Sequence, residues 1–378
     1  IRVRYGCRWE STRREDGPDG RFILTTSDGE YRAKVVVFAV GVAEPWRPST
    51  PGMELVAHYA DTQPAEAYAG KRLFIVGKQN SGFELASGLL QWSSRIVLAS
   101  PSPAKLSVNT HSLVGVRARY VQPFEDHNLG GGVSILDAAI ESIERSEDTF
   151  LVRLRRADES TPIAFEADAV IAATGFVTPL LDLPDLGVAT FGQSRLPAQT
   201  PYWESATVPG IYFAGTITQG SGGLKKHGIP ANSGAVHGAR YNARILARRI
   251  AAEHFGISVE RPTLAPADVL GFALDELAEA PELWHQRAYL ARAILVSPEA
   301  GIVDDGIVPL TTFLDGGGPD GLALTIEADG TGASYPAIYV RRRGAIEERL
   351  LPSHPLLDFR TAEHRAELVS LLDGLGVR

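Results

Sequence analysis

A strand, a glycine turn and a helix follow one another between residues 70 and 90, and this segment constrains the fold more than any other. Leu73–Val76 is a short apolar run typical of a buried strand, and Gly77 permits a sharp turn after it. The pattern then predicts a helix from Ser81 to Leu90. A helix that begins directly after such a turn presents free N–H groups and a positive dipole end, which together favour a bound phosphate group.

The spacing of the glycines indicates that this phosphate belongs to a dinucleotide. A G-x-G-x-x-G motif between a strand and a helix is typical of dinucleotide-binding units. Gly77 and Gly82 occupy the first and third glycine positions, whereas Gln79 replaces the second. A dinucleotide can bind if the Gln79 side chain turns outward or contacts the ligand; the alternative is an ordinary strand–turn–helix unit without a ligand. The residues expected at this site are Gly77, Gln79, Asn80, Ser81, Gly82 and Glu84.

Length and charge limit the classes of protein that remain. The 378 residues suffice for two or three domains, and a hydrophobic share of 44% supports full-sized cores. A net charge of −8 without a basic stripe argues against a nucleic-acid partner. We find no apolar run long enough to cross a bilayer and no signal peptide, so we expect no membrane partner.

The cysteine content narrows the redox chemistry. Cys7 is the single cysteine of the sequence, which excludes an intrachain disulfide, a C-x-x-C redox pair and a cysteine zinc site. We expect no metal site and a reducing, cytoplasmic location. The sequence starts at Ile1 rather than at a methionine, within what reads as a strand, so we expect it to be a fragment.

Two regions are expected to contain buried strands that end at glycines. Residues Ile1–Gly41 predict antiparallel strands, and the last of them, Tyr31–Val40, contains an apolar run, Val35–Val40, that is expected of a strand buried on both faces. Residues Ala167–Phe176 predict another buried strand that ends at Thr174 and Gly175, where the sheet leads back to another domain.

The remainder of the chain alternates between strand and helix patterns. A strand over Pro209–Gly215 is followed by a glycine-rich loop, Gly220–Gly228, and by a long amphipathic helix from about Asn232 to His254. A new region starts at Pro262. The elements expected in it are two helices over Ala265–Ala293, a β-rich stretch over Ile302–Leu351 and a final helix over Thr361–Leu375.

In this order, the segments resemble the flavin-dependent pyridine-nucleotide oxidoreductases, which include thioredoxin-reductase-like proteins and flavin-containing monooxygenases. The matching segments are FAVG with its trailing prolines, HYADTQP, IVGKQNSGFELA, DAVIAATGF and PGIYFAG. The resemblance extends from about Ile1 to Phe255. It implies an α/β fold with two Rossmann-like dinucleotide-binding domains, one for FAD and incomplete at its N-terminus. The remainder, from about Pro262 to Arg378, lies outside the resemblance and is expected to be an appended small α/β domain.

The resemblance also implies a division into domains. Residues 1–69 and 176–261 would form the partial FAD-binding domain, residues 70–175 an inserted NAD(P)H-binding domain, and residues 262–378 a C-terminal domain of unknown role. The first FAD motif of the family, a glycine-rich turn, would lie upstream of Ile1. We therefore expect either a truncated sequence or a partner chain that supplies this motif.

The cofactors implied by the resemblance are FAD and NADP. The C-terminal flavin motif reads Ala-Gly-Thr where relatives often have Ala-Gly-Asp, so Thr216 would offer a hydroxyl in place of a charge. A helix beginning near Asn232 would direct its N–H groups at the flavin; the alternative is a simple helix with Asn232 as its N-cap. The residues implied at the flavin and at the strand ends are Val40, Gly41, Thr174, Gly175, Gly215, Thr216, Asn232 and Ser233.

The choice between NADP and NAD depends on the second strand of the inserted domain. An acid at the end of that strand would favour NAD by binding the ribose 2′-OH. The strand Arg95–Ala99 is instead followed by Ser100, so we expect NADP, with Ser100 or Lys105 near the 2′-phosphate. NAD remains the alternative cofactor, because no arginine that could bind the 2′-phosphate of NADP follows the strand directly.

Three functions fit these features. The first is a flavin monooxygenase acting on a small soft nucleophile or ketone, in which Asn80 would be the catalytic residue near the nicotinamide; the alternative role of Asn80 is to cap the helix. The second is an NADPH-dependent reductase that passes electrons to a disulfide, quinone or ferredoxin, similar to bacillithiol-disulfide reductases. The third is a non-catalytic nucleotide-binding subunit. A small substrate or redox acceptor is the expected partner, and a homodimer stays open.

Two short polar segments have competing interpretations. Lys225-Lys226-His227 lies in the loop before the last flavin helix, so it could face substrate, but a solvated run is the more common outcome. His58 and Tyr59 could line a domain junction, but buried aromatic residues that fill a core are more common.

Overall fold

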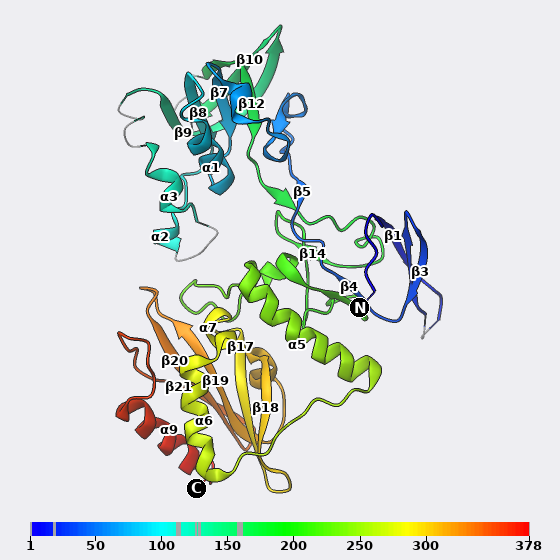
Figure 1. The fold of residues 1–378 in the computed structure, drawn as a ribbon, viewed down its shortest axis with the longest axis vertical. Coiled ribbons are helices and arrows are strands. Elements are labelled where there is room, and N and C mark those ends of the chain that lie inside the picture. Colours follow the sequence, from blue (N-terminus) through cyan, green and yellow to red (C-terminus); the bar gives the residue numbers. More distant parts are fainter. Residues whose placement is uncertain are drawn as a thin grey trace. The chain divides into compact units, whose positions relative to one another are not determined.

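The computed structural model of the chain describes residues 2–17, 20–110, 115–124, 127, 130–156 and 162–377. By their contacts, the residues form two compact units. One unit consists of Ala43–Val177, and the other combines Ile1–Val42 with Thr178–Arg378 (Figure 1). We call them the inserted unit and the outer unit. The division into three domains stays a prediction.

The inserted unit is built on a seven-stranded mixed sheet. In sheet order its strands are β11 (Ile163–Ala167), β10 (Thr149–Arg156), β9 (Val133–Ser146), β8 (Arg95–Ser100), β7 (Arg72–Val76), β12 (Ala169–Ala172) and β6 (Ala57–His58). The pairs from β9 through β8, β7 and β12 to β6 are parallel, whereas β9, β10 and β11 pair antiparallel. The parallel half is the part expected of a dinucleotide-binding fold.

Strand β7 is central because both of its faces are covered. Leu73 and Ile75 pack into one apolar cluster with Phe83 of helix α1 (Asn80–Leu89), whereas Phe74 packs into another cluster on the opposite face. This double burial explains the uninterrupted apolar run in the sequence. Further helical segments bounded within the described residues of this unit are η1 (Met53–Leu55), η2 (Tyr59–Asp61), η3 (Ala65–Tyr68), α2 (Ser107–Thr110) and α3 (Ala118–Val121).

Two short strands lie where the chain enters and leaves the inserted unit. They are β5 (Glu44–Pro45) and β13 (Phe176–Val177), which pair antiparallel. The Trp46 N–H donates a hydrogen bond to the Gly175 carbonyl at 3.0 Å and extends this pairing. The two chain segments through which the chain enters and leaves the inserted unit are therefore hydrogen-bonded to each other.

The outer unit contains an antiparallel sheet and a parallel strand pair. The sheet has the order β1 (Trp9–Arg14), β2 (Phe22–Thr26) and β3 (Gly29–Ala33), which confirms the predicted antiparallel start of the chain. The expected last strand of this group is instead β4 (Val36–Phe38), which pairs parallel with β16 (Ile211–Phe213). It is buried on one face only, because Val37 between its two buried neighbours is 44% exposed.

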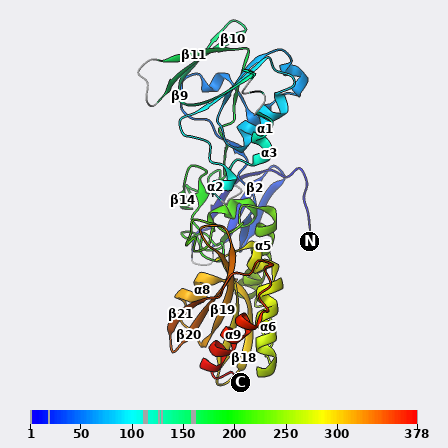
Figure 2. The same ribbon diagram turned by 90° about the vertical axis from the view of Figure 1, so that its left-hand side faces the viewer.

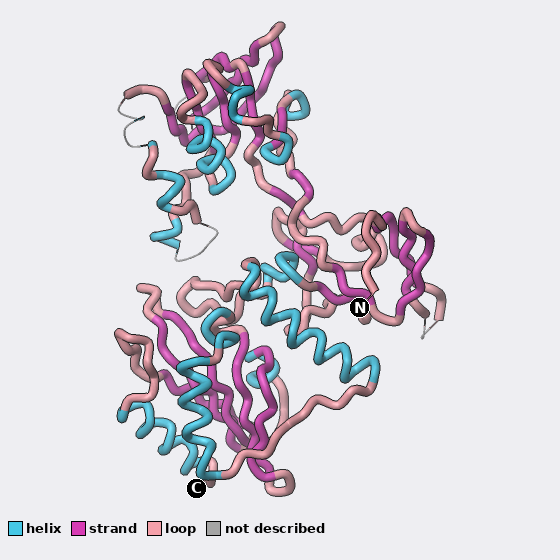
Figure 3. Tube along the Cα trace, viewed as in Figure 1, coloured by secondary structure: helices cyan, strands magenta, loops and turns pink. Residues whose placement is uncertain are grey.

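The connecting elements of the outer unit lead to one long helix. They are β14 (Thr190–Phe191), β15 (Leu196–Pro197), η4 (Gly215–Gly220) and α5 (Val236–Phe255). Figure 3 shows α5 as a continuous helix after an extended loop. The helix ends at Gly256, whose left-handed backbone (φ 65°) is a common way to terminate a helix.

A five-stranded antiparallel sheet completes the outer unit. Its order is β18 (Gly301–Pro309), β17 (Leu290–Ser297), β19 (Asp320–Ala328), β20 (Ser334–Arg342) and β21 (Ala345–Leu350). Helices α6 (Pro266–Glu279), α7 (Pro281–His285) and α9 (Ala362–Gly374) pack on one face, and α8 (Leu310–Asp315) packs on the other (Figure 2). The two helices predicted over Ala265–Ala293 are present as α6 and α7, but the end of that range is strand β17.

A membrane-spanning helix needs a certain length and apolar character. Among the residues that the structure describes, we find no helix that is both long and apolar enough to pass through a bilayer.

Candidate functional site

The turn between β7 and α1 requires glycine at two positions. Gly77 has a φ of +115°, and a Cβ there would lie 2.4 Å from the Ala173 carbonyl oxygen. A Cβ at Gly82 would lie 2.3 Å from the Gly77 carbonyl oxygen. Both distances are too short for any side chain, so these two glycines allow the first turn of α1 to pack directly against the strand end.

The N-terminus of α1 is not capped by the residue that precedes it. Gln79 precedes the helix with an extended backbone, and its exposed side chain makes no capping hydrogen bond. A residue other than glycine is therefore tolerated at the second motif position. Gln79 thus provides no side-chain cap at this helix end, and the N-terminus of a helix favours a bound phosphate.

Asn80 orients a neighbouring loop rather than capping the helix. Its amide nitrogen donates to the Gly115 carbonyl oxygen at 3.1 Å, and its amide oxygen accepts from the Arg117 N–H at 3.3 Å. Helix α1 begins at Asn80, one residue earlier than predicted, with Gln79 in the N-cap position. The capping role for Asn80 is thus wrong, and its catalytic role stays a prediction.

Glu84 lies within a small polar cluster on the surface of α1. Its carboxylate accepts from the hydroxyl of Tyr59 at 3.2 Å and from that of Tyr120 at 3.1 Å, and the Arg119 guanidinium donates to the Tyr120 hydroxyl. Burial, and secondarily the Glu84 charge, raises the pKa of Tyr59. These contacts connect α1 to η2 and α3, and the predicted contact between Glu84 and the cofactor stays a prediction.

Lys78 is a residue of this site that the sequence analysis missed. It follows Gly77 directly, is 1% exposed, and forms an ion pair with Asp137 of β9. Burial lowers the pKa of Lys78. Asp137 pairs in register with Ser100 at the end of β8, so the ion pair lies at the edge of the sheet where the strands end. The fully polar motif segment gave no signal that its lysine would be buried.

The predicted 2′-phosphate residues lie at the same edge of the sheet. The Ser100 hydroxyl donates to the Ser102 carbonyl at 3.3 Å, and Lys105 is exposed. Strand β8 itself carries no acid at its end, as the sequence analysis noted. Asp137 on the neighbouring strand supplies an acid, but it is paired with Lys78. The preference for NADP stays a prediction.

Thr174 and Gly175 form the exit from the sheet. The Thr174 hydroxyl donates to the Trp46 carbonyl, and Gly175 has a φ of +94°. The Gly175 carbonyl also accepts from Nε2 of His58, at 3.1 Å. Nδ1 of His58 accepts from the Ala60 N–H at 3.1 Å, so Nε2 carries the proton in the neutral ring. His58 is fully buried, which confirms the interpretation as a core residue.

The burial of His58 predicts a pH dependence of stability. Burial lowers the pKa of His58 below 6.5, a shift increased by Arg47 and opposed by Asp61 and by the Gly175 carbonyl. Because the unfolded chain binds the proton more readily, this stabilisation is complete above about pH 6.5 and is lost as the pH falls. We expect the melting temperature to decrease more steeply between pH 7.5 and pH 5 in the wild type than in His58→Gln. Parallel pH profiles would contradict this. The comparison with the variant is needed because burial also lowers the pKa of His285.

In the outer unit, the ends of β4 and β16 bring two predicted cofactor residues together. Phe38 pairs with Phe213 in register, and both strands then turn at glycines. Gly41 has a φ of +70°, and a Cβ there would lie 3.4 Å from the Thr216 hydroxyl oxygen. Gly215 has a φ of +80° and starts η4. Val40, which precedes Gly41, is half-buried and packs against the apolar cluster behind β4.

The prediction that the last helix begins near Asn232 is wrong. Helix α5 begins at Val236, and Ala235 occupies the N-cap position. The Asn232 N–H donates to the His285 carbonyl at 3.2 Å, which holds the preceding loop against α7. A glycine inside α5 was a signal for this arrangement: the Asn232 carbonyl oxygen lies 2.0 Å from where a Cβ of Gly238 would be.

Ser233 is fully buried in a polar network. Its hydroxyl donates to the Ser221 carbonyl at 2.6 Å and accepts from the side-chain amides of Asn242 (3.1 Å) and Gln286 (3.0 Å). This network connects the glycine-rich loop to α5 and α7. The assignment of Asn232 and Ser233 as cofactor-binding residues stays a prediction, but Ser233 has no exposed surface to offer a ligand.

Comparisons with known proteins agree with this architecture. The profile of the pyridine nucleotide-disulphide oxidoreductase family matches residues 10–215. The FAD-dependent oxidoreductase domain-containing protein 2 of Mus musculus is 25% identical over 305 residues, which cover 74% of this chain and 45% of the mouse protein. The chain thus spans less than half the length of that relative.

Two solved structures resemble the chain at the level of the fold. The bacillithiol disulfide reductase Bdr of Bacillus cereus aligns with a TM-score of 0.52 and 22% identity, over 67% of this chain and 73% of the reductase. The cadaverine monooxygenase of desferrioxamine biosynthesis from Erwinia amylovora, solved with FAD, aligns with a TM-score of 0.51 and 15% identity, over 68% of this chain and 71% of the monooxygenase. Both carry the two-domain α/β architecture that was predicted.

Proposed function

Because the chain belongs to the pyridine nucleotide-disulphide oxidoreductase family, we propose that it is an FAD-linked, NAD(P)H-dependent oxidoreductase that oxygenates a small soft nucleophile or ketone. The observation that carries this proposal is the packing of Gly82 against Gly77, where a Cβ would lie 2.3 Å from a carbonyl oxygen. Such a close helix–strand contact is what a dinucleotide-binding turn requires. The substrate class and the use of oxygen are parts of the proposal.

The residues of the inserted unit fit a pyridine dinucleotide. The N-terminus of α1, where Gln79 provides no side-chain cap, would hold the pyrophosphate, and Gly77 and Gly82 let the first turn of α1 pack against the strand end beside it. Ser100 and the exposed Lys105 would approach the 2′-phosphate of NADP. The bound dinucleotide supplies a hydride. Asn80 would position the nicotinamide side of the site, since its own amide is oriented by two backbone groups of the loop 115–117.

The residues of the outer unit fit part of a flavin. The 3.4 Å approach of Gly41 to Thr216 makes a shallow edge in which any larger residue at Gly41 would fill the space beside the hydroxyl. Thr216 would donate a hydrogen bond to the flavin side chain without adding a charge. A flavin, when bound there, would supply the redox chemistry. The buried network around Ser233 would keep the glycine-rich loop in place beside it.

The cysteine content supports oxygen over a dithiol as the electron acceptor. Within this chain, Cys7 is the single cysteine, and it is partly exposed on the segment before β1. Transfer of electrons through an internal C-x-x-C pair would need two neighbouring cysteines. Reduction of an external disulfide, quinone or ferredoxin is the alternative outcome, and a nucleotide-binding subunit without activity is the third.

An oxygen balance on the purified, FAD-reconstituted protein tests the proposal. We expect a flavin absorption spectrum, and NADPH and O₂ consumed in equal amounts, with little H₂O₂ when a panel of thioethers, amines and ketones is supplied. NADPH oxidation that proceeds anaerobically with a disulfide or quinone and is insensitive to oxygen would replace this function with a reductase. A protein that binds neither flavin nor NADPH would support the non-catalytic subunit.

A further inference from the structure

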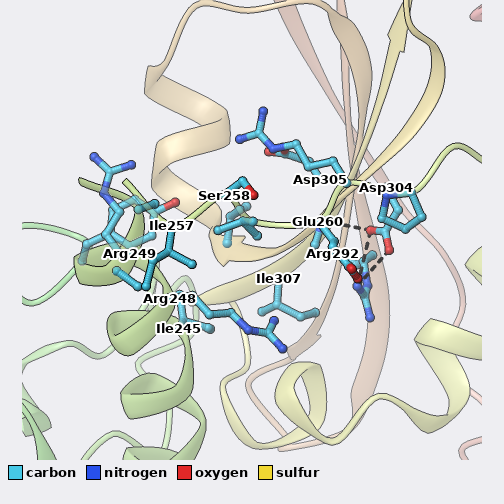
Figure 4. A pocket seen from close by; sticks show the side chains of 18 residues that line it. Ile245, Arg248, Arg249, Ile257, Ser258, Glu260, Arg292, Asp304, Asp305 and Ile307 are labelled. Carbon is cyan, nitrogen blue, oxygen red and sulfur yellow. Dashed lines mark hydrogen bonds and ion pairs between the residues drawn. The ribbon is translucent and has the colours of Figure 1, made fainter. Parts of the chain in front are cut away.

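A pocket of about 500 Å³ lies in the outer unit, and none of the residues proposed to bind the nucleotide or the flavin lines it (Figure 4). It is enclosed by the C-terminal half of α5, the segment 256–262 and strands β17 and β18. This volume lies within the range of small-molecule sites, which is about 300–1,000 Å³. Arg248 in its lining lies 12 residues after the first residue of α5, which places it about 18 Å along the helix from the loop proposed to contact flavin.

The pocket has an apolar wall. Ile245 of α5 is 7% exposed, and Ile307 and Val308 of β18 face the same space together with Ala252. The ring of Tyr202 lies beside them, and burial raises its pKa. A ligand that fills this space therefore requires an apolar body.

Most charged groups in the lining neutralise one another. Arg292 donates to Glu276 at 2.7 Å and to Asp304 at 3.2 Å, and Arg261 pairs with Asp305 at 2.8 Å. Arg249 is engaged as well, because it pairs with Glu253 one turn later on α5 and stacks 4.7 Å above the Tyr202 ring.

Two charges in the lining are left over. Within the described parts of the chain, the side chains of Arg248 and Glu260 form no hydrogen bond or ion pair, and both residues are exposed at the mouth of the pocket. Figure 4 shows Arg248 reaching toward Ile307, whereas Arg249 points away from the pocket. One cation and one anion without partners thus line the same pocket.

We propose that this pocket binds an amino acid with an apolar side chain. Its carboxylate would pair with Arg248, its ammonium group with Glu260, and its side chain would lie on Ile245 and Ile307. A dianion or a dication would leave one of the two protein charges opposed by a like charge, which disfavours both. The pocket is distinct from the nucleotide and flavin residues, so the bound amino acid is an effector or a second ligand rather than the oxidised substrate.

Calorimetric titration of the purified chain with leucine and phenylalanine tests this assignment. We expect saturable one-to-one binding, with at least tenfold weaker affinity in Arg248→Met. The matched control is Arg244→Met, which removes an arginine one turn earlier on the same helix; Arg244 pairs with Glu282 and does not line the pocket. The affinity of Arg244→Met for both amino acids should stay within twofold of that of the wild type. Failure of both amino acids to bind, or equal losses in the two variants, would overturn the proposal.

Two analogues of leucine test the role of each charge. We expect 4-methylpentanoate, which lacks the ammonium group, to bind more weakly than leucine and to lose no affinity in Glu260→Gln, which removes a like charge. We expect 3-methylbutylamine, which lacks the carboxylate, to lose no affinity in Arg248→Met for the same reason. If 4-methylpentanoate bound as tightly as leucine, the amino-acid assignment would be wrong. An Ala252→Trp variant, which fills the pocket, should abolish binding of all three ligands, and retained binding would place the ligand elsewhere.

Discussion

Lys226→Met is expected to lower the free energy of unfolding by about 2–4 kcal/mol, because it leaves a buried carboxylate without its cation. The Nζ atom of Lys226 donates to the two carboxylate oxygens of Glu327 at 3.1 and 2.9 Å and to the Tyr339 hydroxyl at 2.6 Å, and it also pairs with Glu348. Glu327 is 2% exposed. We expect a loss in the lower part of this range, because the Lys226 side chain is 30% exposed and solvent weakens the ion pair.

The same change should loosen the glycine-rich loop. Lys226 lies in this loop, and Glu327 lies on β19 of the five-stranded sheet, so their contact ties the loop before α5 to the C-terminal sheet. In a holoprotein of the proposed function, we therefore expect weaker flavin binding together with the lower melting temperature. Thermal melting followed by near-ultraviolet circular dichroism and a flavin titration would measure the two effects.

A matched control and a double variant separate the charge effect from a general disturbance of the loop. Lys225→Met removes the same side chain from the exposed neighbouring position and should leave the melting temperature almost unchanged. Lys226→Met combined with Glu327→Gln should recover part of the loss, because no unpaired charge is left buried. If the two single lysine variants melted at the same temperature, the ion pair would not stabilise the unit.

The role of Lys226 could not be predicted because its partners are distant in sequence. Lys225-Lys226-His227 was expected to face substrate or, more commonly, to be solvated; all three residues are exposed, but the ion pair of Lys226 with a buried carboxylate was not predicted. The local sequence contains two lysines and a histidine between glycines, whereas the acid that neutralises Lys226 lies 101 residues later. The sequence of β19 does not indicate this ion pair either, because Glu327 is one charged residue near the end of an otherwise apolar run. Tyr339 has its pKa raised by burial and by the two carboxylates, another effect that only the assembled sheet produces.

The glycine turn of the inserted unit was predictable because its requirements are local. Gly77 and Gly82 are five residues apart, and the contact between them depends only on a strand followed by a helix. The start of α5 was not predictable in this way. The Asn232–Ser233 segment has good capping residues, but His285 and Gln286, about 50 residues later, hold it in the loop. Tertiary contacts here overrode the local helix signal.

Gly82→Val is expected to reduce hydride transfer from NADPH at least about 100-fold, since displacing reacting groups by roughly 1 Å has effects of that size. The new Cβ would lie 2.3 Å from the Gly77 carbonyl oxygen and 3.0 Å from its carbon, both of them backbone atoms. The first turn of α1 must therefore move away from β7, and the N–H groups that would hold the pyrophosphate move with it. Stopped-flow measurement of flavin reduction by NADPH reports this loss directly.

Gly88→Val provides the matched control for this displacement. Gly88 lies on the same helix, is exposed, and has no heavy atom within 4 Å of the position a Cβ would take. Because valine also suits a helix interior slightly better than glycine, we expect unchanged hydride transfer and equal or higher stability. Circular dichroism on both variants separates a local shift of α1 from unfolding of the inserted unit. If Gly82→Val remained folded and reduced flavin as fast as Gly88→Val, pyridine nucleotide would bind elsewhere, and the assignment of the β7–α1 turn would be wrong.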